Sequence, residues 1–157
     1  MHKLDLIDRK ILMQLQRDAS QSIQAIAAQV GLTSNPCWRR IKRLEEAGII
    51  SGRVARVDPM AMGLKMTCFV TLHTEDHSED WLRAFNAAMQ KIPEVVECHR
   101  MTGDVDYLMK ILAYDLEHYD EIYRKLIRLV PGLNDVSSAF SMERLKDGHI
   151  IPVDTEF

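Results

Sequence analysis

The segment from Ser22 to Gly52 constrains the fold of this chain most, because it contains two short helical patterns separated by a glycine. In the first pattern, apolar residues recur at helical spacing from Ile23 to Val30, and the preceding Ser22 favours a helix N-terminus. Gly31 follows at the position where helices commonly end in a left-handed conformation. Two helices joined by so tight a turn predict a helix-turn-helix.

The second helical pattern has an apolar face and a basic face. Cys37, Ile41 and Leu44 share one side at about 100° per residue, and either Ser34 or Asn35 can cap the helix. The opposite face is polar and cationic towards its N-terminal end, which is the end that meets base edges in helix-turn-helix proteins. The residues expected to contact DNA are Ser34, Asn35, Pro36, Trp38, Arg39, Arg40, Lys42 and Arg43, with Arg53 from the following segment.

The segments on either side of the helix pair complete a domain. A third helix is expected from Asp5 to about Arg17, and a two-stranded ribbon from Ile49 to Val57. A charged helix by itself is usually only solvated. Three helices followed by a ribbon, in this order, favour a winged helix-turn-helix domain that reads DNA.

Charge is unevenly distributed along the chain. Residues 1–57 hold 10 Lys+Arg against 5 Asp+Glu, whereas residues 58–157 hold 10 against 18, so the net charge of −3 conceals a basic first third. A basic domain suits a nucleic-acid partner, and DNA would repel the acidic remainder. We therefore expect a DNA-binding domain over residues 1–57, a linker over residues 58–65 and a second domain over residues 66–157.

An internal repeat runs through this second domain. Each half reads strand, helix, strand, with apolar residues at strand or helix spacing. The six expected elements are Met66–Thr74, Glu79–Lys91, a strand that starts within residues 92–97 and runs to Met101, Tyr107–Ala113, Leu116–Leu129 and Val136–Met142. Two β-α-β units predict the ferredoxin-like βαββαβ arrangement, so the chain as a whole is expected to be α+β.

The first of these strands supplies apolar residues to both faces of the predicted sheet. Val70 and Leu72 alternate with Phe69, which must point the other way. A ferredoxin-like sheet has helices on only one face, so an apolar second face requires a partner. We therefore expect a homodimer that forms through the sheets.

Several classes of site and location are not indicated. Cys37, Cys68 and Cys98 include no CxxC pair, which argues against a disulfide framework and favours the reducing cytoplasm. There is no signal peptide and no apolar run of membrane-spanning length, so no membrane partner is expected. The histidines are scattered, and no P-loop, GxGxxG or HExxH motif occurs. The sequence thus predicts no catalytic residues, no metal and no cofactor.

The segment from Cys98 to Met109 interrupts two strands with a polar turn. The turn Thr102-Gly103-Asp104 offers free backbone N–H groups, and the carboxylates of Asp104 and Asp106 can accept hydrogen bonds from an ammonium group. The residues alone leave two interpretations open: a ligand-binding loop, or an ordinary polar hairpin turn.

Two sets of motifs occur in order along the chain. They are NPCWRRIKRLEEAGII with the VDP that follows, and then TGDVDYLM, YDEIYRKL and VPGLNDVSSAFSMERLK. Together they resemble the leucine-responsive and asparagine-operon regulator (Lrp/AsnC) family from about Leu4 to Pro152. The resemblance implies a transcriptional regulator that reads a pseudo-palindromic operator in double-stranded DNA and responds to a small-molecule effector, an amino acid or a related metabolite. It also implies dimers that often assemble into octamers.

In that family the effector lies between dimers, beside the loop that corresponds here to residues 100–107. The implied effector-binding residues are Arg100, Met101, Thr102, Gly103, Asp104, Val105, Asp106 and Tyr107, with Ser137 and Ser138 from the last strand. Leucine itself is not implied, because Arg100 stands where the leucine-responding pattern has an apolar residue.

Two alternatives stay open. The same two-domain fold resembles siroheme decarboxylases, which bind a tetrapyrrole between the domains, and a third possibility is a module that modulates other family members by mixed assembly. The run of cations from Arg39 to Arg43 favours a DNA-binding regulator over the enzyme.

Overall fold

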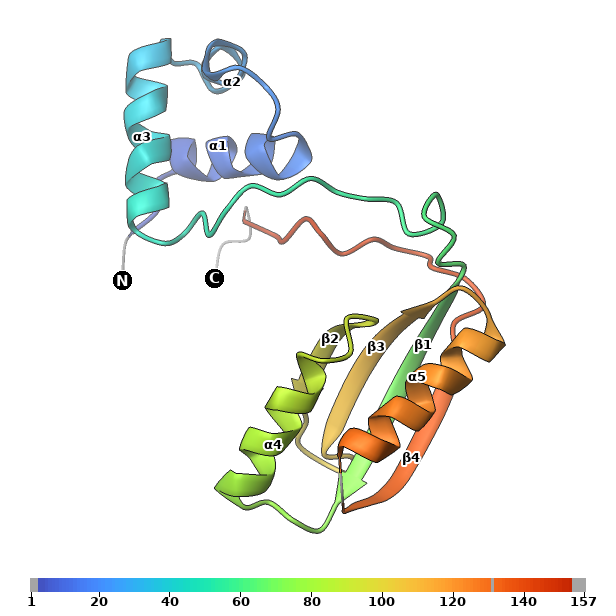
Figure 1. Ribbon diagram of the computed structural model, residues 1–157. Coiled ribbons are helices and arrows are strands. Elements are labelled where there is room, and N and C mark those ends of the chain that lie inside the picture. The colour runs from blue at the N-terminus through green and yellow to red at the C-terminus, as the bar shows by residue number, and fades with distance from the viewer. Residues whose placement is uncertain (1–2, 131, 154–157) are drawn as a thin grey trace. The chain divides into compact units, whose positions relative to one another are not determined.

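The computed structural model in Figure 1 describes residues 3–130 and 132–153, which form two compact units. The first unit combines the N-terminal residues up to Arg56 with the C-terminal residues from Leu145 on. The second unit runs from Val57 to Arg144. In sequence, therefore, the second unit is inserted between the two parts of the first.

Three helices build the first unit. They are α1 (Leu6–Arg17), α2 (Ile23–Val30) and α3 (Ser34–Glu46). Side chains cap the first two: Asp5 accepts a hydrogen bond from the backbone N–H of Asp8 (2.8 Å), and Ser22 accepts one from Ala25 (3.1 Å). Gly31 follows α2 with φ +73°, which confirms the glycine turn expected from the sequence.

The core of this unit lies where the three helices meet. Its buried apolar residues are Ile11, Leu12, Ile26, Ala27, Val30, Cys37, Ile41 and Leu44. The expected apolar face of α3 is thereby confirmed. The N-cap of α3 is Thr33, which makes no side-chain capping bond, so neither Ser34 nor Asn35 caps the helix as the sequence suggested.

The β-ribbon expected over residues 49–57 is not formed, and no described residue between α3 and position 65 lies in a strand. The residues expected to start the ribbon instead form hydrogen bonds with the C-terminal end of α3. Gly48 adopts φ +69°, and the backbone N–H groups of Ile49 and Ile50 both donate to the carbonyl of Leu44 (3.0 and 3.1 Å). These N–H groups are therefore not available to a strand ladder.

The C-terminal segment packs against α1. The Gln16 side chain donates to the carbonyl of Ile151 (3.2 Å) and accepts from its N–H (2.8 Å). Arg9 donates to the carbonyl of Val153 (2.8 Å), whose side chain packs against the helical core. These contacts explain why the C-terminal residues from Leu145 on group with the helices.

The second unit is a four-stranded antiparallel sheet with two helices. Its elements are β1 (Met66–Thr74), α4 (Glu79–Met89), β2 (Val95–Arg100), β3 (Tyr107–Ala113), α5 (Leu116–Leu129) and β4 (Leu133–Phe140). The strand order is β2-β3-β1-β4, and both helices cover the same face (Figure 1), which confirms the βαββαβ fold. The largest difference is at β4, which begins three residues before the expected Val136 because Leu133 pairs with Thr74.

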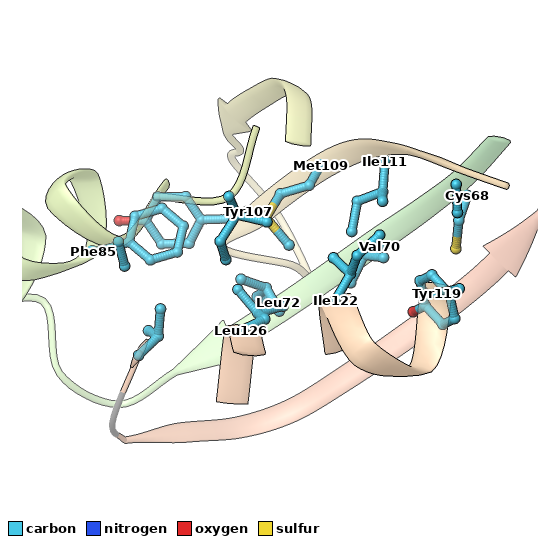
Figure 2. Packing of buried hydrophobic residues seen from close by; sticks show 14 of the residues in the cluster. Cys68, Val70, Leu72, Phe85, Tyr107, Met109, Ile111, Tyr119, Ile122 and Leu126 are labelled. Atoms are coloured by element: carbon cyan, nitrogen blue, oxygen red, sulfur yellow. The ribbon is translucent and has the colours of Figure 1, made fainter. Parts of the chain in front are cut away.

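The core of the second unit lies between the sheet and its helices (Figure 2). Val70 and Leu72 are fully buried on the helix side, where Phe85 of α4 and Tyr107 of β3 bring their ring centroids to 4.4 Å. Phe69, on the opposite face, is 41 % exposed. The predicted alternation is confirmed, and the face away from the helices carries an exposed aromatic ring. None of the described helices is long and apolar enough to cross a membrane.

Candidate DNA interface and effector site

The N-terminal half of α3 presents a polar surface to solvent. Burial of Cys37 and Ile41 in the core turns the residues on the opposite side of the helix outward. The exposed residues there are Ser34, Asn35, Pro36, Trp38 and Arg39. Arg39 forms no hydrogen bond or ion pair with any residue in the described parts of the chain, so its guanidinium is available to a partner.

Two of the expected DNA-contacting arginines are bound to acidic residues at the start of α1. Arg40 donates to Oδ1 of Asp8 (2.8 Å) and Oδ2 of Asp5 (2.6 Å), while Arg43 donates to Oδ2 of Asp8 (2.7 Å). The Asp8 N–H and the Arg40 guanidinium lower the pKa of Asp5, and hydrogen bonds to Asp5 and Asp8 raise the pKa of Arg40. Sequence reasoning missed Asp8, because an acidic residue in the first turn is an ordinary feature of helices.

The other expected cations pair with carboxylates at the surface. Lys42 and Arg53 donate to Glu45 (2.9 and 3.0 Å), and these contacts, led by that of Lys42, lower the pKa of Glu45. Arg56, a further cation of the segment after α3, forms an ion pair with Asp147. The three basic side chains are each about half exposed, so these pairs are weak and can exchange with other anions.

The expected effector loop connects β2 to β3 and is anchored to β1 through Asp106. The N–H of Met101 donates to the carbonyl of Asp106 (2.8 Å), and the N–H of Asp106 donates to the carbonyl of Leu72 (3.0 Å). Oδ2 of Asp106 accepts from the backbone N–H of Thr74 (2.9 Å). Gly103 adopts φ +111°, which residues with a side chain rarely do. The exposed residues of the loop are Arg100, Met101, Thr102, Gly103 and Asp104, followed by the partly buried Val105 and Asp106.

Two histidines that the sequence patterns did not single out lie beside Asp106. Nδ1 of His73 is 4.0 Å from Oδ2, and Nε2 of His77 is 3.9 Å from Oδ1. Their spacing is not helical, and only the turn that follows β1 brings both to the loop. Among the described residues, Oδ1 of Asp106 accepts no hydrogen bond, and no group of three or more His, Cys, Asp or Glu is arranged to hold a metal ion.

Three of the expected effector residues lie apart from the surface of this loop. Tyr107 is 4 % exposed and packs in the core against Phe85, and burial raises its pKa. Ser138 hydrogen-bonds to the hydroxyl of Tyr119, whose pKa burial raises to about 12. Ser137 points to the opposite face of β4. Strand β1 separates both serines from β3 and the loop.

Two family models match the chain in succession. One describes a winged helix-turn-helix DNA-binding domain and matches residues 4–51, and the other describes the Lrp/AsnC ligand binding domain and matches residues 67–151. The chain belongs to the Lrp/AsnC family. It is a DNA-binding transcriptional regulator with an Lrp/AsnC ligand-binding domain, as its motifs predicted.

Individual transcriptional regulators match over almost the full length of the chain. The DNA-binding transcriptional activator DecR of Escherichia coli (strain K12) is 46 % identical over 151 residues, which are 96 % of this chain and 99 % of DecR. The crystal structure of an AsnC family transcriptional regulator from Agrobacterium tumefaciens matches with a TM-score of 0.92 at 44 % identity, covering 96 % of this chain and 98 % of that one. The structure of transcriptional regulator NMB0573 in complex with L-Met, from Neisseria meningitidis, matches with a TM-score of 0.91 at 29 % identity. The match covers 97 % of this chain and 98 % of that one.

These relatives also decide between the two functional classes left open by the sequence. They are transcriptional regulators and not enzymes, so the alternative of a siroheme-decarboxylase-like enzyme is set aside.

Proposed function

We propose that this Lrp/AsnC regulator reads a pseudo-palindromic operator through α3 of two protomers. The observation that carries the proposal is the exposed N-terminal end of α3, where the guanidinium of Arg39 has no partner among the described residues. Arginine reads guanine through two hydrogen bonds in the major groove. The proposed contacts are Ser34, Asn35, Pro36, Trp38, Arg39, Lys42 and Arg53. Arg40 and Arg43, also expected from the sequence, support the helix through Asp8.

The proposed effector is an amino acid bound beside the 100–107 loop. Oδ1 of Asp106 has no hydrogen-bond donor in the described chain and suits an ammonium group, while Arg100 at the end of β2 suits a carboxylate. The L-Met complex of the Neisseria meningitidis relative supports this class of ligand. Ser137 and Ser138 would contribute from another copy of the chain, because β1 separates them from the loop within one copy.

We further propose that the regulator is a cytoplasmic homodimer that assembles to an octamer through residues 66–157, with residues 58–65 as the linker to the DNA-binding residues 1–57. The exposed ring of Phe69, on the sheet face that no helix covers, supports the dimer. Phe69→Glu places a charge on that face and should shift the full chain towards monomer. Sedimentation measures this, and an unchanged assembly would contradict the proposed interface.

Two experiments test DNA reading and sensing. Enrichment of duplexes from a random library by the full chain, followed by fluorescence anisotropy, tests DNA reading, and no enrichment would contradict it. A thermal-shift screen of the twenty amino acids tests sensing, because a ligand bound only by the folded state raises stability by about 2.7 kcal/mol at 100 times its Kd. A bound amino acid that changes neither operator affinity nor assembly would contradict the regulatory link.

A further inference from the structure

Asp8 is one of two buried polar side chains among the residues that the structure describes, and it is 1 % exposed. A buried carboxylate is costly unless it is paired. Here each oxygen accepts a hydrogen bond from a different arginine of α3, Oδ1 from Arg40 and Oδ2 from Arg43. The helix proposed to read DNA therefore supplies both charged partners of a carboxylate in the first turn of α1, whose Oδ2 also accepts from the backbone N–H of Asp5 (3.3 Å).

This arrangement limits how α3 can turn. Arg40 and Arg43 are three positions apart, so they leave the same side of the helix on successive turns. Bonds from both to one carboxylate restrict rotation of α3 about its axis and sliding along α1. The apolar contacts of Ile41 and Leu44 also hold α3 against the core, but they are less directional than hydrogen bonds from two arginines to one carboxylate. Arg39 precedes Arg40 by one residue, about 100° around the axis, so its direction depends on this rotation.

The same bonds determine which cations are free to meet DNA. If Arg40 or Arg43 moved to a phosphate, the buried charge of Asp8 would lose a partner. Lys42 and Arg53 differ, because their shared partner Glu45 is partly exposed and the pairs can exchange at little cost.

We propose that Asp8 is a positioning residue for operator recognition. Through Arg40 and Arg43 it holds α3 in the rotation that directs Arg39 to base edges, and it keeps these two cations off the phosphate backbone. The proposal rests on the DNA-reading function proposed for α3. It makes sequence specificity depend on a side chain that does not touch DNA.

The test compares the full wild-type chain with Asp8→Asn and with the matched control Asp18→Asn. Asp18 is exposed at the C-terminal end of α1, where its carboxylate accepts hydrogen bonds from Ser20. Its variant removes the same charge from the same unit without releasing an arginine. For each protein, affinity is measured over a range of salt concentrations for a selected operator and for a scrambled duplex of equal length.

Asp8→Asn should lower operator affinity about tenfold or more, the scale of one oriented arginine–guanine contact. Affinity for the scrambled duplex should rise, and its log–log salt slope should steepen by up to about 0.9 per released cation. Partial unfolding cannot produce this result, because it lowers both affinities in proportion. Asp18→Asn should leave the ratio of the two affinities as in wild type. An unchanged ratio in folded Asp8→Asn overturns the proposal.

Arg43→Gln provides a second variant in which Asp8 keeps its bonds from Arg40 and from the N–H of Asp5. Operator affinity should fall while scrambled-duplex affinity and its salt slope stay as in wild type. A salt slope shallower by about 0.9 would identify Arg43 as a phosphate contact and overturn the proposal. If the wild-type chain bound the selected operator and the scrambled duplex with equal affinity, the proposed DNA-reading function itself would be contradicted.

Discussion

Two aspartates, Asp8 in the helical unit and Asp106 in the sheet unit, differ in how many of their carboxylate oxygens accept hydrogen bonds from the chain. Asp8 is 1 % exposed, and both its oxygens accept hydrogen bonds from arginines. Asp106 is 31 % exposed, and within the described chain only Oδ2 accepts a hydrogen bond, from Thr74. A carboxylate whose partners all belong to the chain orders the structure around it. A carboxylate on an exposed loop, with one oxygen that accepts no hydrogen bond from the described residues, remains available to a ligand.

The comparison predicts, as its largest effect, that stability depends more on Asp8 than on Asp106. Asp8→Ala should lower the free energy of unfolding by about 2–3 kcal/mol, less than for a fully buried ion pair because Arg43 is half exposed. Asp106→Ala removes the bond from Thr74 and should cost about 1 kcal/mol. Urea unfolding measures both variants, and equal losses of unfolding free energy would contradict the proposed difference between Asp8 and Asp106.

The second prediction concerns effector binding. Asp106→Asn keeps the shape of the side chain but removes its charge, so affinity for the amino acid found in the thermal-shift screen should fall at least about tenfold. Operator binding without effector should change little, because the residue lies in the other unit. Calorimetry and a melting curve separate lost binding from lost folding. Asp80→Asn, at an exposed aspartate of α4 in the same unit and outside the loop, is the matched control. Unchanged effector affinity in Asp106→Asn would contradict a role of this carboxylate in binding.

Next in size is the effect of Arg39 on operator reading. Arg39→Ala should weaken operator binding by about 1–3 kcal/mol and binding to a scrambled duplex much less, because a base contact is lost. Lys42→Ala should weaken both to a similar extent, since a phosphate contact carries no sequence information. Anisotropy titrations measure both variants. Operator binding by Arg39→Ala that equals wild type would show that α3 is not the base-reading helix.

The smallest effect expected is on the loss of folding stability at acidic pH. Because the pKa of Asp5 is lower in the folded chain, the unfolded chain binds this proton more readily. The stabilisation is present above about pH 4, the ordinary range for aspartate, and is lost as pH falls through the lower folded pKa. Asp5→Asn should therefore flatten the fall of Tm on acidification. If the two curves run parallel, the contacts of Asp5 contribute nothing measurable.

Much of the fold was predictable because local apolar spacing reports secondary structure. The bounds of β1, β3 and α5 match the sequence-based expectation, and α1 ends at the expected Arg17. The ribbon expected after α3 was a wrong prediction, because the apolar residues that follow Gly48 donate their N–H groups to the carbonyl of Leu44 instead of to a strand. Strand propensity alone does not reveal that the end of a helix competes for the same backbone N–H groups.

The candidate sites likewise combine features that the sequence predicted with features that depend on tertiary contacts. Sequence patterns placed the basic face on α3, and the family resemblance placed the proposed effector loop between β2 and β3. Charge counting, however, made Arg40 and Arg43 equivalent to Arg39, since a sequence shows how many cations a helix carries but not which have partners. Likewise, nothing in the spacing of His73 and His77 connects them with Asp106.

The sequence by itself determined the helices, most of the strands and the family, because these depend on neighbouring residues and short motifs. Only the tertiary structure decided which charges are free. Asp8 meets Arg40 and Arg43 across 32 and 35 residues, a contact that exists only because the packing of α1 against α3 brings their polar edges together. Burial then makes that carboxylate depend on both arginines, and this dependence is a property of the packed helices rather than of any local pattern.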